Sequence, residues 1–366
     1  MSQELVERLV AELTAAGRLT DPRWAEALRA VPRHLFVPDV AWAVFDRPGA
    51  DGAAIDRNAD PDRWLDVVYS DTAIATQVDD GAGDPGTCSG TWTSSCSTPG
   101  IVAIFLELLR PLDHHRVLEI GTGTGWTSAL LSWRLGGGNV TSVEIDEAIA
   151  ERAAANVAAA GQAPRLVRGD GERGHADGAP YDRVHVTCGV ERVPYPWVEQ
   201  CRPGGVIVMP WLPGWNMGHI ARLTAAGDGT ASGRLTGQAG FMMLRSQRRP
   251  PGPPADADTG AAEESATRLD PRILIGDAQG ADVAITALVP GVRTALSPAA
   301  DGSMRVWAIE TAGGSWAAVD FTPGRDDFRV LQYGPRPLGR DRDRLHDLGQ
   351  VGAAGTGTLR SHRHAR

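Results

Sequence analysis

The chain has 366 residues, enough for one large domain or two smaller ones, and its formal net charge of −9 argues against a nucleic-acid groove as its main feature. All 36 basic residues are arginine, which excludes P-loop phosphate sites and Schiff-base chemistry, because both need a lysine. No stretch approaches 18 consecutive apolar residues and the N-terminus is polar and amphipathic, so we expect neither a membrane span nor a secretory signal.

The first hundred residues predict a mixed region. Two short helices are expected over 2–16 and 21–30, the second opened by Asp21 and Pro22 as cap and first-turn proline. A short strand is expected near 69–75. Residues 79–98 are rich in Gly, Thr, Ser and Cys without any period, and a structureless segment of this length is usually functional or mobile. We therefore divide this region into an N-terminal helical cap, 1–78, and an active-site insertion loop, 79–98.

A nucleotide-binding unit follows a helix that begins at Pro99. The apolar run Val117–Ile120 predicts a buried strand, which leads into the glycine loop GTGTG at 121–125 and then into a helical pattern, Trp126–Leu135. A second apolar strand ends at Glu144, and 144 − 121 places this acid 23 residues after the first glycine. Strand, glycine turn, helix, strand and acid are typical of a βαβ unit that binds the ribose of an adenosine.

The loop favours one kind of adenosine cofactor. The dinucleotide fingerprint has a third glycine at the sixth position, where it allows close packing below a pyrophosphate. Here that position is Trp126, which suits a ligand without a diphosphate, such as S-adenosylmethionine. A tight turn in some other α/β protein, or a nicotinamide dehydrogenase, is the alternative that these residues leave open.

Further strands place more polar residues at one edge of the predicted sheet. The strand at 165–168 ends in Gly169-Asp170-Gly171, the strand at 181–186 ends at Thr187, and a fifth strand follows Gly205 and runs to about Pro210. In open parallel sheets, ligands bind outside the carboxyl ends of the strands. An acid such as Asp170 can accept a hydrogen bond from an adenine amino group. Two more strands, 219–223 and 240–244, are expected to close the sheet in antiparallel fashion.

The last third of the chain predicts a separate small unit. Residues 248–268 have the composition of a linker. Beyond it, 272–289 and 304–321 alternate like strands, so we expect an α+β appendage over 269–335. Residues 336–366 are aperiodic and rich in Arg, Gly and His, which predicts a disordered tail. The methyltransferase-like domain between these parts would span 99–247.

Eight segments, in order, resemble the protein-L-isoaspartate O-methyltransferase family. They are VPRHLFVP at 31–38, YSDTA at 69–73, Ser97-Thr98-Pro99 with VAIFLELL, VLEIGTGTGW, SVEID, GDG, YDRVHV and RPGG. The resemblance covers roughly residues 1–245. It implies a Rossmann-like class I methyltransferase sheet, and transfer of a methyl group from S-adenosylmethionine to an aspartyl or isoaspartyl carboxylate of a protein or peptide. The resulting methyl ester can cyclise to a succinimide (aspartimide).

The resemblance also implies roles for individual residues. Ser97 would be the active-site residue that contacts the carboxylate. The cofactor would be held by Glu119, Gly121, Thr122, Gly123, Gly125, Glu144, Ile145, Asp170, Gly171 and Thr187. The substrate would contact Ser95, Cys96, Thr98 and His185.

Three of these residues have plainer interpretations. Ser97 before a helix that begins with proline is also a common N-cap, and a helix N-terminus is itself an anion site. His185 is expected to be a core histidine in preference to a general base. Cys96 is expected to be a small buried cysteine, with a redox-sensitive thiol as the alternative. The four cysteines have no metal-ligand spacing, so we expect no metal, and reduced thiols in the cytoplasm.

The chain departs from the family's compact repair enzymes around the substrate. The segment before Ser97 is longer, and the appendage beyond 266 is additional. Two substrate hypotheses follow: damaged isoaspartyl proteins, or a dedicated ribosomal precursor peptide, as in relatives beside lanthipeptide or graspetide biosynthesis. Concentration of extra sequence near the substrate favours the second. A non-catalytic S-adenosylmethionine-binding protein is a remote third. We expect a monomer that binds neither nucleic acid nor membranes.

Overall fold

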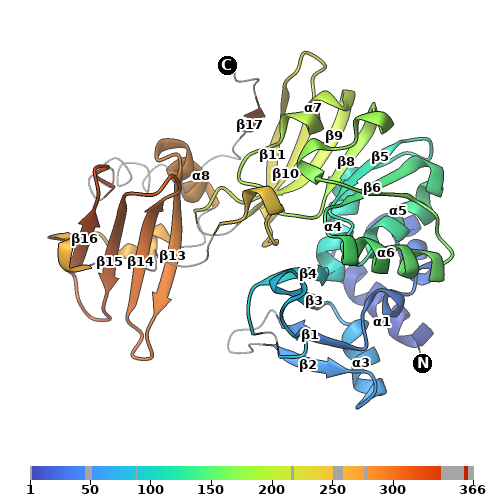
Figure 1. The fold of residues 1–366 in the computed structure, drawn as a ribbon, viewed down its shortest axis with the longest axis horizontal. Coiled ribbons are helices and arrows are strands. Elements are labelled where there is room, and N and C mark those ends of the chain that lie inside the picture. The colour runs from blue at the N-terminus through green and yellow to red at the C-terminus, as the bar shows by residue number, and fades with distance from the viewer. Residues whose placement is uncertain are drawn as a thin grey trace.

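The structure is a computed structural model that describes residues 2–45, 52–87, 89–215, 218–249, 259–275, 279–338 and 358–361. Within these ranges the strands form three sheets, of four, eight and five strands. The eight-stranded sheet is central in the chain, and the five-stranded sheet lies to one side of it (Figure 1). The predicted fold class, a Rossmann-like α/β sheet with a C-terminal α+β appendage, is confirmed.

The N-terminal part combines helices with an antiparallel sheet. Helices α1 (Ser2–Ala15) and α2 (Pro22–Ala30) are followed by the short helix η1 (Arg33–Phe36) and by α3 (Pro61–Val68). The sheet has the order β2-β1-β3-β4, with β1 (Val40–Val44), β2 (Ala53–Asp56), β3 (Ala73–Val78) and β4 (Trp92–Cys96). The strand predicted near 69–75 overlaps β3, whereas β1 and β2 were not predicted within the helical cap, 1–78.

The predicted insertion loop contains the turn and the second strand of a β-hairpin. This strand, β4, pairs with β3, with Ile74 opposite Cys96 and Val78 opposite Trp92. The prediction of a structureless segment was wrong for 92–96, because the alternation of buried Ser94 and Cys96 with more exposed neighbours is hidden in a polar run of Thr and Ser. The connection between the strands includes the short helix η2 (Asp79–Gly81).

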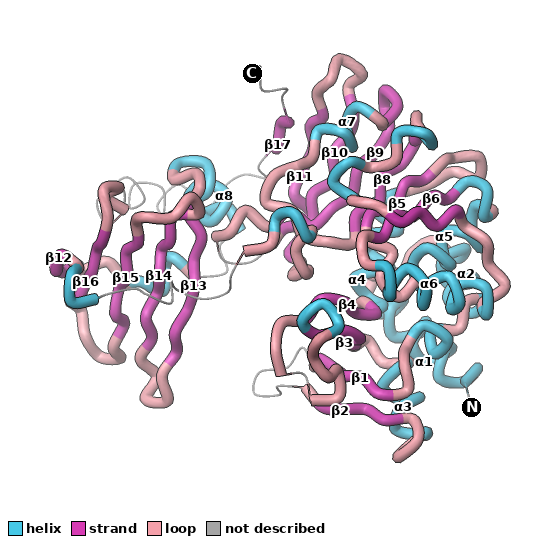
Figure 2. The backbone as a smooth tube through the Cα atoms, viewed as in Figure 1, coloured by secondary structure: helices cyan, strands magenta, loops and turns pink. Residues whose placement is uncertain are grey.

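The central sheet carries the expected parallel core. Five parallel strands lie in the order β7-β6-β5-β8-β9. They are β5 (Val117–Ile120), β6 (Val140–Glu144), β7 (Arg165–Arg168), β8 (Tyr181–Val186) and β9 (Cys201–Trp211). The covering helices are α4 (Pro99–Leu109), α5 (Trp126–Leu135), α6 (Glu147–Ala159) and α7 (Tyr195–Glu199). Figure 2 shows the parallel strands side by side, with α4, α5 and α6 between them and the N-terminal sheet.

Antiparallel strands extend this sheet beyond β9. Strand β10 (His219–Ala225) pairs with β9, and β11 (Ala231–Gln238) pairs with β10. The prediction of the second strand at 240–244 was wrong, because that segment crosses the end of the sheet, where Gly189 forms an isolated parallel bridge with Met243. Strand β17 (Thr358–Ser361) pairs with β11, so the predicted disordered tail is wrong at these four residues. Residues 339–357 and 362–366 lie outside the described residues.

The C-terminal part is a five-stranded antiparallel sheet with the order β12-β16-β15-β14-β13. Its strands are β12 (Glu263–Thr267), β13 (Val292–Pro298), β14 (Met304–Glu310), β15 (Trp316–Phe321) and β16 (Phe328–Tyr333). The linker prediction was wrong at 263–267, which forms β12; residues 250–258 lie outside the described residues. The expected strand at 272–289 is instead the helix α8 (Gln279–Leu288), in which Ile285 is buried beside Val289 and Val292.

A buried contact between a histidine and an aspartate joins α8 to the central sheet. His219 Nε2 on β10 lies 2.9 Å from Asp282 Oδ2 on α8, and both side chains are almost fully buried. Among the described residues, no helix is long and apolar enough to cross a membrane. The same part of the chain holds no group of three His, Cys, Asp or Glu side chains arranged for a metal ion.

Candidate active site

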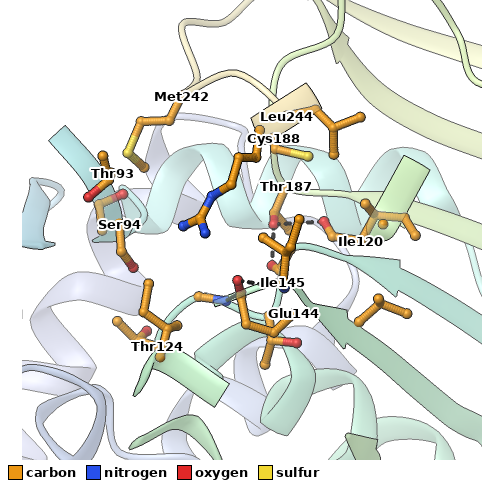
Figure 3. A pocket seen from close by; sticks show the side chains of 18 of the residues that line it. Thr93, Ser94, Ile120, Thr124, Glu144, Ile145, Thr187, Cys188, Met242 and Leu244 are labelled. Atoms are coloured by element: carbon orange, nitrogen blue, oxygen red, sulfur yellow. Dashed lines mark hydrogen bonds between the residues drawn. The ribbon is translucent and has the colours of Figure 1, made fainter. Parts of the chain in front are cut away.

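A pocket opens at the carboxyl ends of β5, β6 and β8 (Figure 3). Its empty volume, which includes its open mouth, is about 920 Å³. The described lining combines the glycine loop, the ends of three strands, part of β4 with Ser97, and a segment from 242 to 248. These residues are Thr93, Ser94, Ser95, Ser97, Ile120, Gly121, Thr122, Gly123, Thr124, Trp126, Thr127, Val143, Glu144, Ile145, Ile149, Asp170, Gly171, Thr187, Cys188, Met242, Met243, Leu244, Arg245 and Arg248.

The glycine loop has a backbone that other residues rarely adopt. Gly121, Gly123 and Gly125 have φ of 88°, 56° and 90°, in the left-handed region that favours glycine. A Cβ at Gly121 would approach Thr187 Oγ1 to 2.7 Å, whereas a Cβ at Gly123 would meet only the carbonyl oxygen of Ser95, at 3.7 Å. The loop therefore leaves room for a ligand on the side of Gly123.

Glu119 supports this loop from below. Its carboxylate is fully buried and accepts hydrogen bonds from Ser142 Oγ at 2.6 Å and from Ser128 Oγ. Ser142 is linked in turn to Thr122 Oγ1 at 2.7 Å. Glu119 does not line the pocket, so the expected contact with a cofactor is wrong for its side chain. The residue anchors Thr122 in the loop.

His185 also lies behind the pocket. Its ring is 2% exposed, packs edge-on against Phe105, and places Nδ1 3.5 Å from Glu119 Oε1. It does not line the pocket, which corrects its assignment to the substrate. The interpretation of His185 as a core histidine is confirmed.

Glu144 presents a carboxylate at the end of β6, facing the pocket (Figure 3). Oε2 accepts from the backbone N–H of Gly123 at 2.9 Å, and Oε1 accepts from those of Ile145 and Asp146 at 2.9 and 3.0 Å. Burial raises the pKa of this carboxyl, against the lowering effect of the three N–H groups. Ile145 beside it is 38% exposed and offers an apolar surface in the same wall.

The pocket lining that follows β7 and β8 includes Asp170, Gly171 and Thr187. Asp170 Oδ1 accepts from the N–H of Glu172 at 3.0 Å, which orients the carboxylate at the end of β7. A Cβ on Gly171 would approach Ile120 Cγ2 to 2.6 Å, so this backbone packs directly on β5. Thr187 Oγ1 donates to the carbonyl oxygens of Ile120 and Gly121 and thereby ties β8 to the glycine loop.

Hydroxyl groups from the hairpin form the opposite wall. Thr93, Ser94, Ser95 and Ser97 all line the pocket. Cys96 is fully buried, which confirms its interpretation as a buried cysteine, and neither Cys96 nor Thr98 is among the lining residues. The assignment of Cys96 and Thr98 as substrate contacts is therefore corrected.

The helix after Ser97 already holds an anion. The N-cap of α4 is Thr98, without a side-chain cap, and the N–H of Gly100 instead donates to Asp71 Oδ1 at 2.6 Å. Asp71 is also paired with Arg18 Nη1 at 2.5 Å. The N-cap interpretation of Ser97 is wrong because the Asp71 carboxylate occupies the end of the helix. Ser97 lies one residue earlier, where it lines the pocket.

A buried arginine holds the backbone of Ser97. Arg33 is 1% exposed, and its guanidinium donates to five carbonyl oxygens. Their residues and distances are Val68 2.6 Å, Ser70 3.3 Å, Thr72 2.8 Å, Cys96 3.2 Å and Ser97 2.9 Å. The Trp126 ring lies 5.1 Å from the guanidinium carbon, a cation–π contact. Arg33 thus links β3, β4 and the start of α5.

The segment 242–248 is part of the site although no sequence motif indicates it. Met242, Met243, Leu244, Arg245 and Arg248 line the pocket, whereas the sequence predicts a strand over the first three of them. Cys188, after β8, also lines it, and burial raises the pKa of its thiol to about 12. No local pattern marks these residues, because the chain returns to the site only after crossing two strands of the sheet.

Comparison with known proteins gives a consistent family. Residues 53–249 match the family model described as protein-L-isoaspartate(D-aspartate) O-methyltransferase. A protein-L-isoaspartate O-methyltransferase from Methanoregula boonei is 34% identical over 232 residues, 63% of this chain and 88% of the relative. One from Methylibium petroleiphilum is 32% identical over 246 residues, 66% of this chain and 77% of the relative.

A solved structure is similar over nearly the whole chain. It is that of a protein-L-isoaspartate O-methyltransferase and aligns with 95% of this chain and 93% of its own, with a TM-score of 0.54 and 23% identity. At this identity the similarity concerns the fold. Since the alignment covers all but a twentieth of this chain, the similarity includes the appended domain as well as the central sheet.

Proposed function

The chain belongs to the protein-L-isoaspartate O-methyltransferase family and is a methyltransferase; from this premise we propose that it methylates the free carboxylate of an isoaspartyl residue with S-adenosylmethionine. One observation carries the proposal. The hydroxyl wall with Ser97 and the nucleotide-type wall with Glu144 and the glycine loop line a single pocket.

The residues of the pocket suit the cofactor. Gly123 has a left-handed backbone, and a Cβ there would meet only the Ser95 carbonyl oxygen, at 3.7 Å, so a ligand can approach the loop closely. Glu144 would accept from the two ribose hydroxyls, Ile145 would pack on the adenine ring, and Asp170 would accept from the adenine amino group. The remaining cofactor contacts that we propose are Gly121, Thr122, Gly125, Gly171 and Thr187.

The chemistry asks little of the protein beyond orientation. When bound, S-adenosylmethionine supplies a methyl group on a positively charged sulfur, which passes to the carboxylate as an O–CH3 bond forms and the S–CH3 bond breaks. The acceptor carboxylate is ionised at neutral pH, so the chain needs no general base. Holding two reactants in line is worth about 7–11 kcal/mol. Ser97 would donate its O–H to one carboxylate oxygen and fix its direction, with Ser95 beside it.

A second substrate remains a candidate. The hairpin that carries Ser97 reaches across the site, where Asp80 pairs with Arg245 and Arg248, and such an elaboration would suit a dedicated precursor peptide. The appended domain does not favour this hypothesis, because a solved protein-L-isoaspartate O-methyltransferase aligns with 95% of this chain. With either substrate, attack of the following amide nitrogen on the ester would expel methanol and give the succinimide.

One assay separates these functions. Methyl transfer from labelled S-adenosylmethionine is measured to an isoaspartyl peptide and to its normal aspartyl twin. Transfer to the isoaspartyl peptide alone supports the proposed function. Cofactor binding without transfer to either peptide would contradict it and leave a dedicated peptide or a non-catalytic binding protein.

A further inference from the structure

Two arginines at the pocket have no role in the function proposed above. Arg245 and Arg248 line the pocket and come from the short helix η6 (Arg245–Gln247) and the residue after it. They are the cationic residues along the described lining. Their side chains are 32% and 27% exposed, which places them at the rim and not at the floor.

Both guanidinium groups converge on one carboxylate oxygen. Asp80 Oδ1 lies 2.9 Å from Arg245 Nη2 and 2.7 Å from Arg248 Nη1. Arg245 has a second partner in Asp146 Oδ2 at 3.0 Å, whereas the carboxylate paired with Arg248 is that of Asp80. Guanidinium groups bind carboxylates through short, charge-assisted hydrogen bonds of defined geometry.

The hairpin adopts an unfavourable backbone at the residue that makes this contact. Asp79 and Asp80 have φ of 48° and 52°, and two successive non-glycine residues in this region are uncommon. The N–H of Asp80 donates to Thr93 Oγ1 at 3.0 Å, and the N–H of Thr91 donates to Asp79 Oδ1 at 2.8 Å. These bonds hold the turn in place. The side chains of Arg245 and Arg248 are nevertheless 32% and 27% exposed, and that of Asp80 is 50% exposed, so a carboxylate from solution has access to the two arginines.

We propose that Arg245 and Arg248 form a subsite for an acidic side chain next to the acceptor residue of the peptide, and that Asp80 holds this subsite in the free enzyme. The inference rests on the proposed function, because it concerns the peptide bound at the same pocket. The position of the pair at the rim assigns it to a neighbour of the acceptor, while the acceptor carboxylate itself reaches the deeper hydroxyl wall. Asp80 is then an internal competitor of the peptide.

The test uses isoaspartyl peptides that differ only in Glu or Gln immediately before or immediately after the acceptor. For the full-length enzyme, kcat/KM for one Glu peptide exceeds that for its Gln twin by about tenfold, the size expected for a hydrogen bond to a charged group. Arg248→Gln removes this preference by raising KM for the Glu peptide. Arg249→Gln is the matched control, because Arg249 pairs with Glu191, and it keeps the preference.

Asp80→Asn distinguishes two roles for Asp80: a carboxylate that competes with the peptide for the two arginines, or a contact that only holds the pocket closed. Asparagine tolerates the left-handed backbone, so the turn is retained while the charge that pairs with the two arginines is lost. The subsite predicts a lower KM for the Glu peptide, with kcat and the affinity for S-adenosylhomocysteine unchanged. A higher KM for both peptides, or weaker binding of S-adenosylhomocysteine, would overturn the proposal, as would equal kcat/KM for every Glu and Gln pair in the wild type.

Failure of the proposed function is distinguishable from failure of the subsite. If the wild type methylates none of the peptides, their binding is measured by fluorescence anisotropy in the presence of S-adenosylhomocysteine. Tighter binding of a Glu peptide that disappears in Arg248→Gln then supports the subsite alone. Equal binding of the Glu and Gln twins rejects it.

Discussion

Arg33 donates from Nη2 to the carbonyl oxygen of Ser97 at 2.9 Å, from a position that is 1% exposed. The guanidinium also donates to the carbonyl oxygens of Val68 at the end of α3, Thr72 just before β3 and Cys96 at the end of β4. Its flat array of five donors suits acceptors spread over several segments. The position of the proposed active-site residue therefore depends on an arginine that does not line the pocket.

Arg33→Gln should destabilise the protein by at least about 3 kcal/mol, because several buried carbonyl groups lose their donors at about 1–3 kcal/mol each. Urea unfolding measures this as a lower midpoint with an unchanged slope. Arg63→Gln, an exposed arginine of the same region, is the control and should stay within about 0.5 kcal/mol of the wild type. Equal midpoints for both variants would show that the carbonyl groups find other donors.

Ser97→Ala should lower kcat for an isoaspartyl peptide by about 10²-fold, since misplacing a reacting group by about 1 Å can cost this much. The affinity for S-adenosylhomocysteine should stay unchanged, because the proposed cofactor contacts lie on the other wall. Ser94→Ala, on the same strand and also lining the pocket, is the comparison and should lose much less. Parallel losses of turnover and cofactor affinity in Ser97→Ala would contradict its role.

Cofactor affinity should fall as the pH is lowered through the pKa of Glu144, which burial raises above the ordinary 4.5. The ionised carboxylate accepts from hydroxyl groups, and protonation replaces an acceptor by a donor. Isothermal titration with S-adenosylhomocysteine over this range measures the effect. Glu144→Gln should bind at least about tenfold more weakly at neutral pH and show no such dependence.

In the ligand-free protein, the raised pKa of Glu144 favours the folded state at low pH, whereas cofactor binding is favoured at high pH. A carboxyl whose pKa is raised in the folded state binds more protons there than in the unfolded chain, so its contribution to stability is present below the unfolded pKa. That contribution is lost as the pH rises through the folded pKa. As the pH rises from the unfolded to the folded pKa of Glu144, the ligand-free Glu144→Gln variant should therefore lose less free energy of unfolding than the wild type. Urea unfolding at each pH measures this difference.

Asp282→Ala should loosen the contact between α8 and the central sheet. The change leaves the buried His219 without its carboxylate partner at 2.9 Å, and a buried polar group without a partner costs about 1–3 kcal/mol. Amide hydrogen exchange should accelerate in α8 but not in β5 or β6. Methylation of a short peptide should persist, because neither residue lines the pocket. Unchanged exchange in α8 would show that its apolar contacts alone hold it.

The sequence was most informative where neighbouring residues make the structure. The glycine loop, Glu144 and Asp170 follow strands along the chain, and the carboxyl ends of parallel strands meet at one edge, so their proximity was predictable. Glu119 was assigned to the cofactor because it belongs to the same motif. Alternation within β5 turns its side chain to the opposite face, where Ser128 and Ser142 bind it.

The remaining errors concern contacts between distant segments. Arg245 and Arg248 reach the site after two antiparallel strands, and Asp71 occupies the end of α4 from 29 residues away. The strand β4 was missed because its Thr and Ser residues resemble a loop in composition. In α8 and directly after it, apolar residues such as Val283, Ile285 and Val289 are compatible with either alternation or a helical face, and packing against Val292 decided between them.

The two walls of the pocket belong to different sheets. The hydroxyl side chains lie on β4 of the four-stranded sheet or, for Ser97, directly after it. Glu144, Asp170 and Thr187 lie at or just after the ends of strands of the eight-stranded sheet. A directed-evolution library restricted to 79–95 could therefore vary the acceptor while the cofactor half of the reaction stays constant. Selection would then act on the hairpin sequence alone. Every new hairpin sequence would still have to place the carbonyl oxygens of residues 96 and 97 within reach of the Arg33 guanidinium.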